Sequence, residues 1–388
     1  MSKLKVIFKK RLYYDLYYGA LMLAVAFWGL LVRRMPKYND IWIIAERAGE
    51  ARDNGIALFR YIMDNNLHPN TFYVLSDSSP DLYKLSGYED RVVRTDSLRH
   101  MLLYVLSTRS ISTQLNYAAP KSAFTKHFKK LMTVKKRFVY LGHGYQKDDV
   151  DFLYKKNAKL DLFVADGRRE AEALMEKGGY GNHEMSLTGR PRNDGLAGFK
   201  VEKEILLMPT HRLWLWRRDK DKIHELFVKS DYYHHYQRLI NNPRLHEFLE
   251  KSGYELLLYP HTLVQRFRKN FTSNSDLIKV VSRADMDIQD ALKRGALLIT
   301  DYSSVAFDFA YMGKPVIYYQ FDYERFRRNQ YNEGWFSYAE DGFGPIVNDE
   351  EGLMDELERA YKNGFANPEE YVIRCDDMYE FRDSGNCR

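Results

Sequence analysis

The chain has 388 residues, more than a single hydrophobic core usually serves, which predicts two domains of comparable size. Its 45% hydrophobic residues, with only 11 Pro and 23 Gly, exclude a chain disordered throughout and a small disulfide scaffold. The 59 Lys and Arg against 53 Asp and Glu give a net charge of +6, which favours phosphorylated small molecules or anionic lipid headgroups. The chain lacks the dense basic blocks of a nucleic-acid binder, so we expect no nucleic-acid partner.

An uncharged apolar segment, Leu16 to Val32, lies near the N-terminus between basic residues. As a helix it would reach roughly 25 Å, which is short of the ~30 Å hydrocarbon core of a bilayer but near the lower limit for a spanning helix. Three interpretations stay open: a helix in the cytoplasmic leaflet, a helix buried in the protein core, and a true span. We favour the first, and expect residues 1–36 to attach peripherally or monotopically to the cytoplasmic face of the cell membrane.

After Pro36 the chain alternates β-rich runs with amphipathic helical stretches, such as 169–177, 288–293 and 353–362. Nearly continuous apolar runs are typical of parallel strands covered on both faces. A Gly-rich and then charged stretch at 195–204 separates two such series, so we predict an α/β protein with two Rossmann-like domains, 37–198 and 199–388, facing each other across a cleft. The predicted strands are Ile41–Ala45, Thr71–Leu75, Arg137–Leu141, Asp161–Ala165, Ile205–Met208, Tyr254–Tyr259, Ile278–Val281, Ala296–Thr300 and Pro315–Tyr319.

The strongest signal is the end of one predicted strand, where residues 296–310 pass through Thr300, Asp301, Ser303 and Ser304 into an apolar helix. A helix start of this kind offers backbone N–H groups, hydroxyl donors and the positive end of the helix dipole, which suit phosphate oxygens. Helix capping is the alternative, but it accounts for one of these residues rather than two hydroxyls and an acid together. We therefore predict a phosphate site here.

The stretch from Leu297 onward, LLITDYSSVAFDFAYMGKPVIYYQFDYERF, resembles the signature of the CDP-glycerol glycerophosphotransferase family, the enzymes of teichoic acid and related capsule synthesis. The similarity covers roughly Ile41 to the C-terminus. Further motifs agree in the same order: Glu46-Arg47 with Ala51-Arg52-Asp53-Asn54-Gly55, Gly142-His143-Gly144, Gly189-Arg190-Pro191-Arg192-Asn193-Asp194, Met208-Pro209-Thr210-His211-Arg212 and Tyr259-Pro260-His261.

The resemblance implies a GT-B-like fold and transfer of a polyol phosphate from a CDP-activated donor to a hydroxyl of a lipid-linked saccharide or growing polymer, with release of CMP. Two family histidines match His143 and His261, and the phosphate-binding serines match Ser303 and Ser304. The family often writes the first motif as His-Gly-Thr followed by Pro and Lys, whereas this chain continues to Tyr145-Gln146-Lys147, which leaves acceptor recognition open. CDP-ribitol or another CDP-polyol, a nucleotide sugar, and an inactive membrane scaffold stay as alternatives.

The two histidines have distinct expected roles. His143 follows a strand and is flanked by glycines, so its imidazole is a candidate base for removing a proton from an acceptor hydroxyl. His261, if protonated, is a candidate for steadying the charge on the departing CMP phosphate. The alternatives are a structural histidine in a loop for the former and a simple strand end for the latter.

Cationic side chains must meet the charge on CMP, because no Asp-x-Asp or His/Cys cluster is convincing as a metal site. We therefore predict chemistry without a metal or other cofactor. The two cysteines, Cys375 and Cys387, lack zinc-site spacing and favour a reducing, cytoplasmic compartment. Candidate cationic helpers are Arg212 on the donor side and Lys147 on the acceptor side, with salt bridges as the alternative; Arg190, Arg192 and Asn193 are candidates to line the cleft or merely close a turn.

Overall fold

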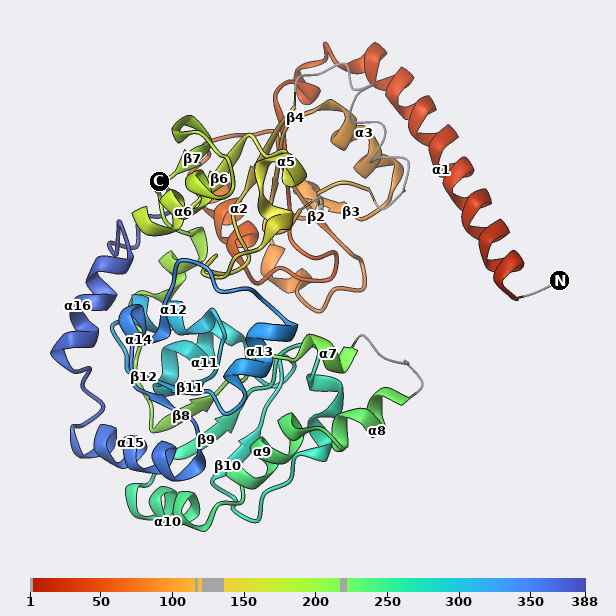
Figure 1. Ribbon diagram of the computed structural model, residues 1–388. Coiled ribbons are helices and arrows are strands. Elements are labelled where there is room, and N and C mark those ends of the chain that lie inside the picture. Colours follow the sequence, from red (N-terminus) through yellow and green to blue (C-terminus); the bar gives the residue numbers. More distant parts are fainter. Residues whose placement is uncertain (1–2, 116–117, 121–135, 217–221) are drawn as a thin grey trace.

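The computed structural model describes residues 3–115, 118–120, 136–216 and 222–388 and contains two α/β domains, one above the other in Figure 1. The described residues form two parallel sheets, seven-stranded in the order β3-β2-β1-β4-β5-β6-β7 and six-stranded in the order β10-β9-β8-β11-β12-β13. In both sheets the strand order reverses beside the first strand, the point at which ligands gather in doubly wound folds. The expected GT-B-like architecture of two Rossmann-like domains is confirmed.

The first domain is built on apolar strands with helices on both faces. Strand β1 (Ile41–Ala45) lies between β2 and β4 and is almost wholly buried, as its continuous apolar sequence requires. Helix α2 (Asn54–Asp64) begins where the carboxylate of Asp53 accepts a bond from the backbone N–H of Asn54. The remaining elements are β2 (Thr71–Leu75), β3 (Val92–Arg94), α3 (Leu98–Leu106), β4 (Ser107–Ser112), β5 (Arg137–Tyr140), α5 (Lys155–Ala158), β6 (Leu162–Val164), α6 (Arg168–Glu176) and β7 (Met185–Ser186).

The second domain repeats this plan around β11 (Gly295–Thr300), every residue of which is buried. Strand β11 pairs with β8 (Glu204–Leu207) and β12 (Val316–Tyr319), so the segment after it lies at the centre of the sheet edge that faces the first domain. The other elements are α7 (Leu213–Trp216), α8 (Ile223–Val228), α9 (Asp231–Leu239), α10 (Pro243–Ser252), β9 (Glu255–Leu258), β10 (Ile278–Val280), α11 (Ile288–Arg294), α12 (Val305–Tyr311), α13 (Tyr323–Asn329), α14 (Tyr338–Asp341), β13 (Ile346–Val347), α15 (Glu350–Lys362) and α16 (Glu369–Met378).

The end of the chain returns to the first domain. Helix α16 runs alongside both domains in Figure 1, and Tyr145 of the first domain donates its hydroxyl to the carbonyl of Met378 at 2.8 Å. Beyond the helix, the backbone N–H of Glu380 donates to the carbonyl of Asp166 at 3.0 Å. The segment 187–203 joins the two sheets. The predicted boundary between the two domains, at residue 198, lies within this segment and stays a prediction.

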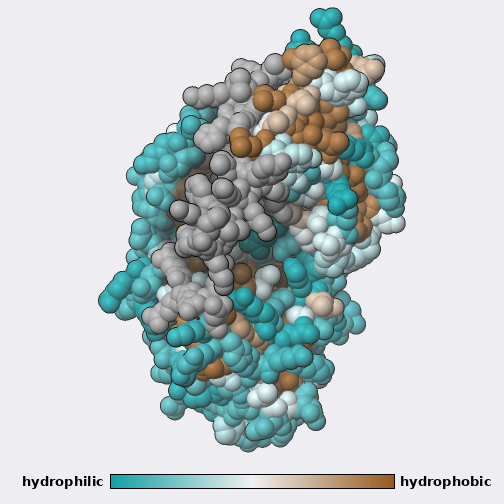
Figure 2. All heavy atoms as spheres, turned by 90° about the vertical axis from the view of Figure 1, so that its right-hand side faces the viewer, coloured by the Kyte–Doolittle hydropathy of each residue, from teal (hydrophilic) through white to brown (hydrophobic). Residues whose placement is uncertain are grey.

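Helix α1 (Lys3–Val32) lies on the outside of the first domain and packs one face against α3 (Figure 1). Met22 is buried there against Met101 and Val105. Over residues 16–32, the opposite face of α1 is apolar and exposed, and the side of the molecule shown in Figure 2 has hydrophobic residues gathered in its upper part, where α1 lies. None of the helices in the described part of the chain combines the length and the apolar character needed to cross a membrane.

Candidate active site

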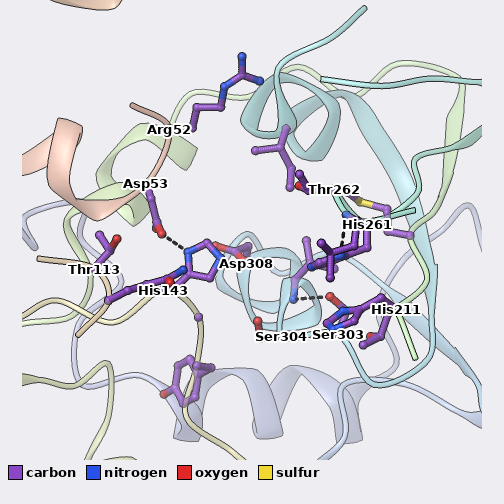
Figure 3. A pocket seen from close by; sticks show the side chains of 18 of the residues that line it. Arg52, Asp53, Thr113, His143, His211, His261, Thr262, Ser303, Ser304 and Asp308 are labelled. Atoms are coloured by element: carbon purple, nitrogen blue, oxygen red, sulfur yellow. Dashed lines mark hydrogen bonds and ion pairs between the residues drawn. The ribbon is translucent and has the colours of Figure 1, made fainter. Parts of the chain in front are cut away.

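A cavity of about 760 Å³ lies between the two domains, at the carboxyl ends of their strands. Loops after β1, β4 and β5 form its first-domain wall, and loops after β8, β9, β10 and β11 form its second-domain wall. Figure 3 shows side chains from both domains pointing into it. Because the carboxyl ends of parallel strands carry the ligand sites of doubly wound sheets, this cavity is the candidate active site.

The first-domain wall holds a histidine–aspartate pair (Figure 3). Nδ1 of His143, just after β5, lies 2.5 Å from Oδ2 of Asp53, the residue that precedes helix α2. A carboxylate only accepts hydrogen bonds, so Nδ1 carries a proton, and in the neutral tautomer Nε2 keeps its lone pair. The His143 side chain is 47% exposed and lines the cavity, whereas that of Asp53 is only 9% exposed. The pair therefore has the arrangement of a base oriented by an acid.

Arg192 ties this pair to the second domain. It donates from Nη1 to Oδ1 of Asp53 and to the carbonyl of His143, both at 2.8 Å, and its other edge contacts both oxygens of Asp308 on α12 at 2.9 and 3.0 Å. Burial alone would raise the pKa of Asp53, but the charge of His143 in its protonated form, the charge of Arg192 and the hydrogen bonds from both outweigh it and hold that pKa well below its usual range. Asp53 therefore stays a carboxylate under physiological conditions.

The second-domain wall carries two stacked imidazoles. The rings of His211, after β8, and His261, after β9, lie 4.2 Å apart with planes inclined by 28°. Burial and the neighbouring positive groups lower the pKa of His261 to about 3 and that of His211 to about 4. The leaving-group role expected of His261 assumed a protonated ring, whereas this lowered pKa favours the neutral form. Since the backbone N–H of Leu263 donates to Nδ1 of His261 at 3.2 Å, the proton of the neutral ring sits on Nε2.

Two hydroxyls from the predicted phosphate segment line the same cavity. Ser303 and Ser304 precede α12, and Ser304 makes no side-chain capping bond with that helix. Ser303 accepts only a long bond, 3.4 Å, from the backbone N–H of Val305. Opposite them, a methyl group on Gly144 would overlap with Oγ of Ser304, so the glycine allows the two domains to approach closely. Capping of α12 therefore does not occupy the hydroxyl hydrogens of Ser303 and Ser304, and both can donate to a ligand.

Three of the predicted donor contacts lie outside the cavity, and the prediction for them is corrected. The Arg212 side chain is completely buried and pairs with Asp301 at 2.8 Å and Asp322 at 2.8 Å. Asp301 also accepts from the backbone N–H of Thr210, and Thr300 donates its hydroxyl to the carbonyl of Met208. Their hydrogen-bonding groups are used inside the protein, so these residues brace the loop that presents Ser303 and Ser304.

Of the residues predicted for the acceptor side, two line the cavity and two are held in buried contacts inside the protein. Lys147 and Arg192 line the cavity, although Lys147 is buried and its Nζ lies 2.5 Å from Asp148. Arg190 is buried beside the cavity wall and pairs with Asp166 and Glu170, both at 2.6 Å. Asn193 donates to Asp166 at 3.0 Å. Arg190 and Asn193 therefore hold the loop together, which corrects the expectation that they line the cleft.

For several lining residues the sequence predicts no specific role, and for Asp53 it leaves helix capping and an acceptor-side role as alternatives. Asp53 and Asp308 belong to quoted motifs, but their pairing through Arg192 joins positions more than a hundred residues apart and requires the fold. In the sequence, the cationic residues of the first-domain wall, Arg47 and Arg52, are marked by their place in the motifs Glu46-Arg47 and Ala51–Gly55. Charged and polar lining residues without a predicted role include Arg47, Glu50, Arg52, His211, Arg283 and Gln289. Within the described ranges, no group of three or more His, Cys, Asp and Glu side chains is placed to hold a metal ion.

Comparison with known proteins identifies relatives of this chain. It is 30% identical over 365 residues to the minor teichoic acid biosynthesis protein GgaB of Bacillus subtilis, a match that covers 90% of this chain and 39% of GgaB. It is 23% identical to the teichoic acid glycerol-phosphate transferase of Staphylococcus aureus, covering 85% of this chain and 86% of that protein. The chain thus spans well under half of GgaB but most of the transferase.

The fold has a counterpart among solved structures. The wall teichoic acid polymerase TagF superimposes with a TM-score of 0.63 at 16% identity, covering 96% of this chain and 95% of that one. The family model described as CDP-Glycerol:Poly(glycerophosphate) glycerophosphotransferase matches residues 27–388. The chain therefore belongs to the CDP-glycerol:poly(glycerophosphate) glycerophosphotransferase family of enzymes.

Proposed function

We propose that this protein transfers glycerol phosphate from CDP-glycerol to a hydroxyl of a lipid-linked saccharide or growing teichoic-acid-type polymer and releases CMP. The observation that carries the proposal is the meeting of the His143–Asp53 pair with Ser303 and Ser304 in one cavity between the domains of a family member. A base and a set of hydroxyl donors on facing walls suit a displacement at phosphorus, which needs little else than alignment.

In this proposal His143 acts as the base. Nε2 takes the proton from the acceptor hydroxyl while the oxygen forms a bond to the phosphorus that carries glycerol, and the bond from that phosphorus to the bridging oxygen of CMP breaks. The imidazolium that results is stabilised by the Asp53 carboxylate at 2.5 Å. Arg192 keeps this carboxylate ionised and fixes its direction.

Neutral donors and fixed cations meet the charge on the departing CMP. Ser303 and Ser304 offer hydroxyls, and the Nε2–H of His261 offers a further hydrogen bond from the same wall. Arg52 is a further cationic side chain in the cavity lining. We expect this set to suffice without a divalent ion or other cofactor, and hence expect transfer to persist in EDTA.

We also propose that α1 holds the enzyme at the cytoplasmic face of the membrane, where a lipid-linked acceptor would lie. One face of the helix is packed on α3, and the other presents large apolar side chains beside the exposed Arg33 and Arg34. Flotation with anionic vesicles should be lost when residues 1–36 are removed; unchanged flotation would contradict this attachment. The exposed apolar residues are Leu16, Tyr17, Leu23, Phe27, Trp28, Leu30, Leu31 and Met35.

Transfer from labelled donor tests the proposed function. Purified protein is incubated with CDP-glycerol, CDP-ribitol or a nucleotide sugar, together with a lipid-linked acceptor, with and without EDTA. We expect label to enter the acceptor from CDP-glycerol and to be unaffected by EDTA. Preferential use of CDP-ribitol or of a nucleotide sugar would identify that compound, instead of CDP-glycerol, as the donor. Cellular polymer that persists with His143→Ala but disappears on deletion of the protein would instead favour a scaffold.

A further inference from the structure

Two arginines from opposite domains share one carboxylate at the rim of the cavity. Arg47 follows β1 in the first domain, and Arg283 follows β10 in the second. Nη1 of Arg283 lies 3.1 Å from one oxygen of Glu50, and Nη1 of Arg47 lies 3.7 Å from the other, which is too long for a hydrogen bond. All three residues line the cavity. We refer to Arg47, Glu50 and Arg283 as the rim triad.

The charge balance of the rim triad differs from that of the neighbouring arginines. Arg52 has the carboxylate of Asp81 to itself, and Arg192 contacts two carboxylates. The rim triad has two guanidinium groups for one carboxylate and thus a net charge of +1. The side chains of Arg47 and Arg283 are 35% and 41% exposed and line the cavity, where Nε and Nη2 of Arg47 also donate to the amide oxygen of Gln114 at 3.0 and 3.1 Å.

The rim triad lies near the reacting groups, since the positive charge of Arg47 contributes to lowering the pKa of both His211 and His261. Nη1 of Arg52 donates to the carbonyl of Arg283 at 3.2 Å, which places the rim triad beside Arg52. Figure 3 shows Arg52 on the opposite side of the cavity from Ser303 and Ser304, with His143 and His261 between them. A group bound at the rim would therefore approach the histidines from the side opposite the donor phosphates.

We propose that Arg47 and Arg283 bind a phosphodiester of the acceptor chain, behind the hydroxyl that attacks the donor. Guanidinium groups recognise phosphate oxygens through paired hydrogen bonds, and two of them on facing walls suit one tetrahedral group. The net charge of +1 matches the single negative charge of a phosphodiester better than the charge of a diphosphate. This inference rests on the proposed function and defines the rim triad as the feature that selects a polymer end over a neutral saccharide.

The test compares acceptors of different charge with the full-length enzyme. Arg47→Gln/Arg283→Gln should raise the KM for an oligo(glycerol phosphate) acceptor by about tenfold or more, corresponding to about 1.4 kcal/mol, while the KM for CDP-glycerol and the rate with a neutral saccharide acceptor stay the same. Glu50→Gln removes the shared negative charge and should lower the KM for the charged acceptor. Arg266→Gln, an exposed arginine outside the cavity lining, is the matched control and should change neither.

Two outcomes would overturn the inference. One is a rise in the KM for CDP-glycerol with no change for the acceptor, which would assign the rim triad to the donor. The other is equal binding of soluble oligo(glycerol phosphate) to wild-type protein and to the folded double variant, measured by calorimetric titration without donor. Because this titration needs no catalysis, a wild-type enzyme that binds the oligomer but transfers nothing would contradict the proposed function alone.

Discussion

The contribution of Asp53 to the base is the most quantitative prediction. Replacing Asp53 with Asn keeps an oxygen that can accept from Arg192 but removes the negative charge 2.5 Å from Nδ1 of His143. Opposite charges about 4 Å apart interact by about 4 kcal/mol at an effective dielectric constant of about 20. Because His143 is 47% exposed, solvent reduces this to roughly 2–3 kcal/mol, so kcat should fall by about 10²-fold.

A double-mutant cycle separates this effect from a general loss of structure. Initial rates of label transfer from CDP-glycerol are measured for wild type, Asp53→Asn, His143→Ala and the double variant. We expect the Asp53 substitution to have little effect once His143 is gone, because its charge then has no imidazolium to stabilise. An equal loss in both backgrounds, or a kcat within about twofold of wild type for Asp53→Asn, would refute the proposed pair.

Three further predictions address the walls of the cavity. Gly144→Ala should crowd Ser304 and raise the KM for CDP-glycerol about tenfold with an unchanged melting temperature, by steady-state kinetics and calorimetry; an unchanged KM would deny the serine its donor role. Arg212→Met should lower the free energy of unfolding by about 3–5 kcal/mol in urea, because two buried carboxylates lose their partner; loss of activity alone would indicate a substrate contact. Because the folded pKa of His261 is lowered to about 3, the unfolded chain binds that proton first, and this contribution to stability is present above pH ~6.5 and lost as the pH falls. His261→Gln should flatten the dependence of the urea midpoint on pH below about 6.5, and an unchanged slope would contradict the burial of this ring.

The sequence predicts the apolar strands of both sheets but not the polar strand β4. Every strand expected from continuous apolar runs is present, because parallel strands buried on both faces leave that pattern. Strand β4, Ser107-Thr108-Arg109-Ser110-Ile111-Ser112, is not among the predicted strands, because it contains no continuous apolar run. It nevertheless lies at the centre of the first sheet, between β1 and β5, where small side chains allow close packing. The short edge strands β3, β7 and β13 were also missed.

The site residues that could be predicted from the sequence differ in their surroundings from those that could not. Residues at strand ends next to glycine or serine, such as His143 and Ser304, were predicted because motif and position agree. The roles of the arginines were not, because a sequence does not reveal how many carboxylates surround a guanidinium. Arg212 has two and is structural, whereas Arg47 and Arg283 share one. That count depends on residues far apart in the chain.

The most direct test of the central claim is the stoichiometry of the reaction. CMP and acceptor-bound glycerol phosphate are quantified together over time for wild type and for His143→Asn. We predict that the two products of the wild-type enzyme accumulate in equal amounts and that both are lost in the variant. CMP without acceptor-bound glycerol phosphate, or full transfer by His143→Asn, would contradict a cavity that aligns donor and acceptor around this base.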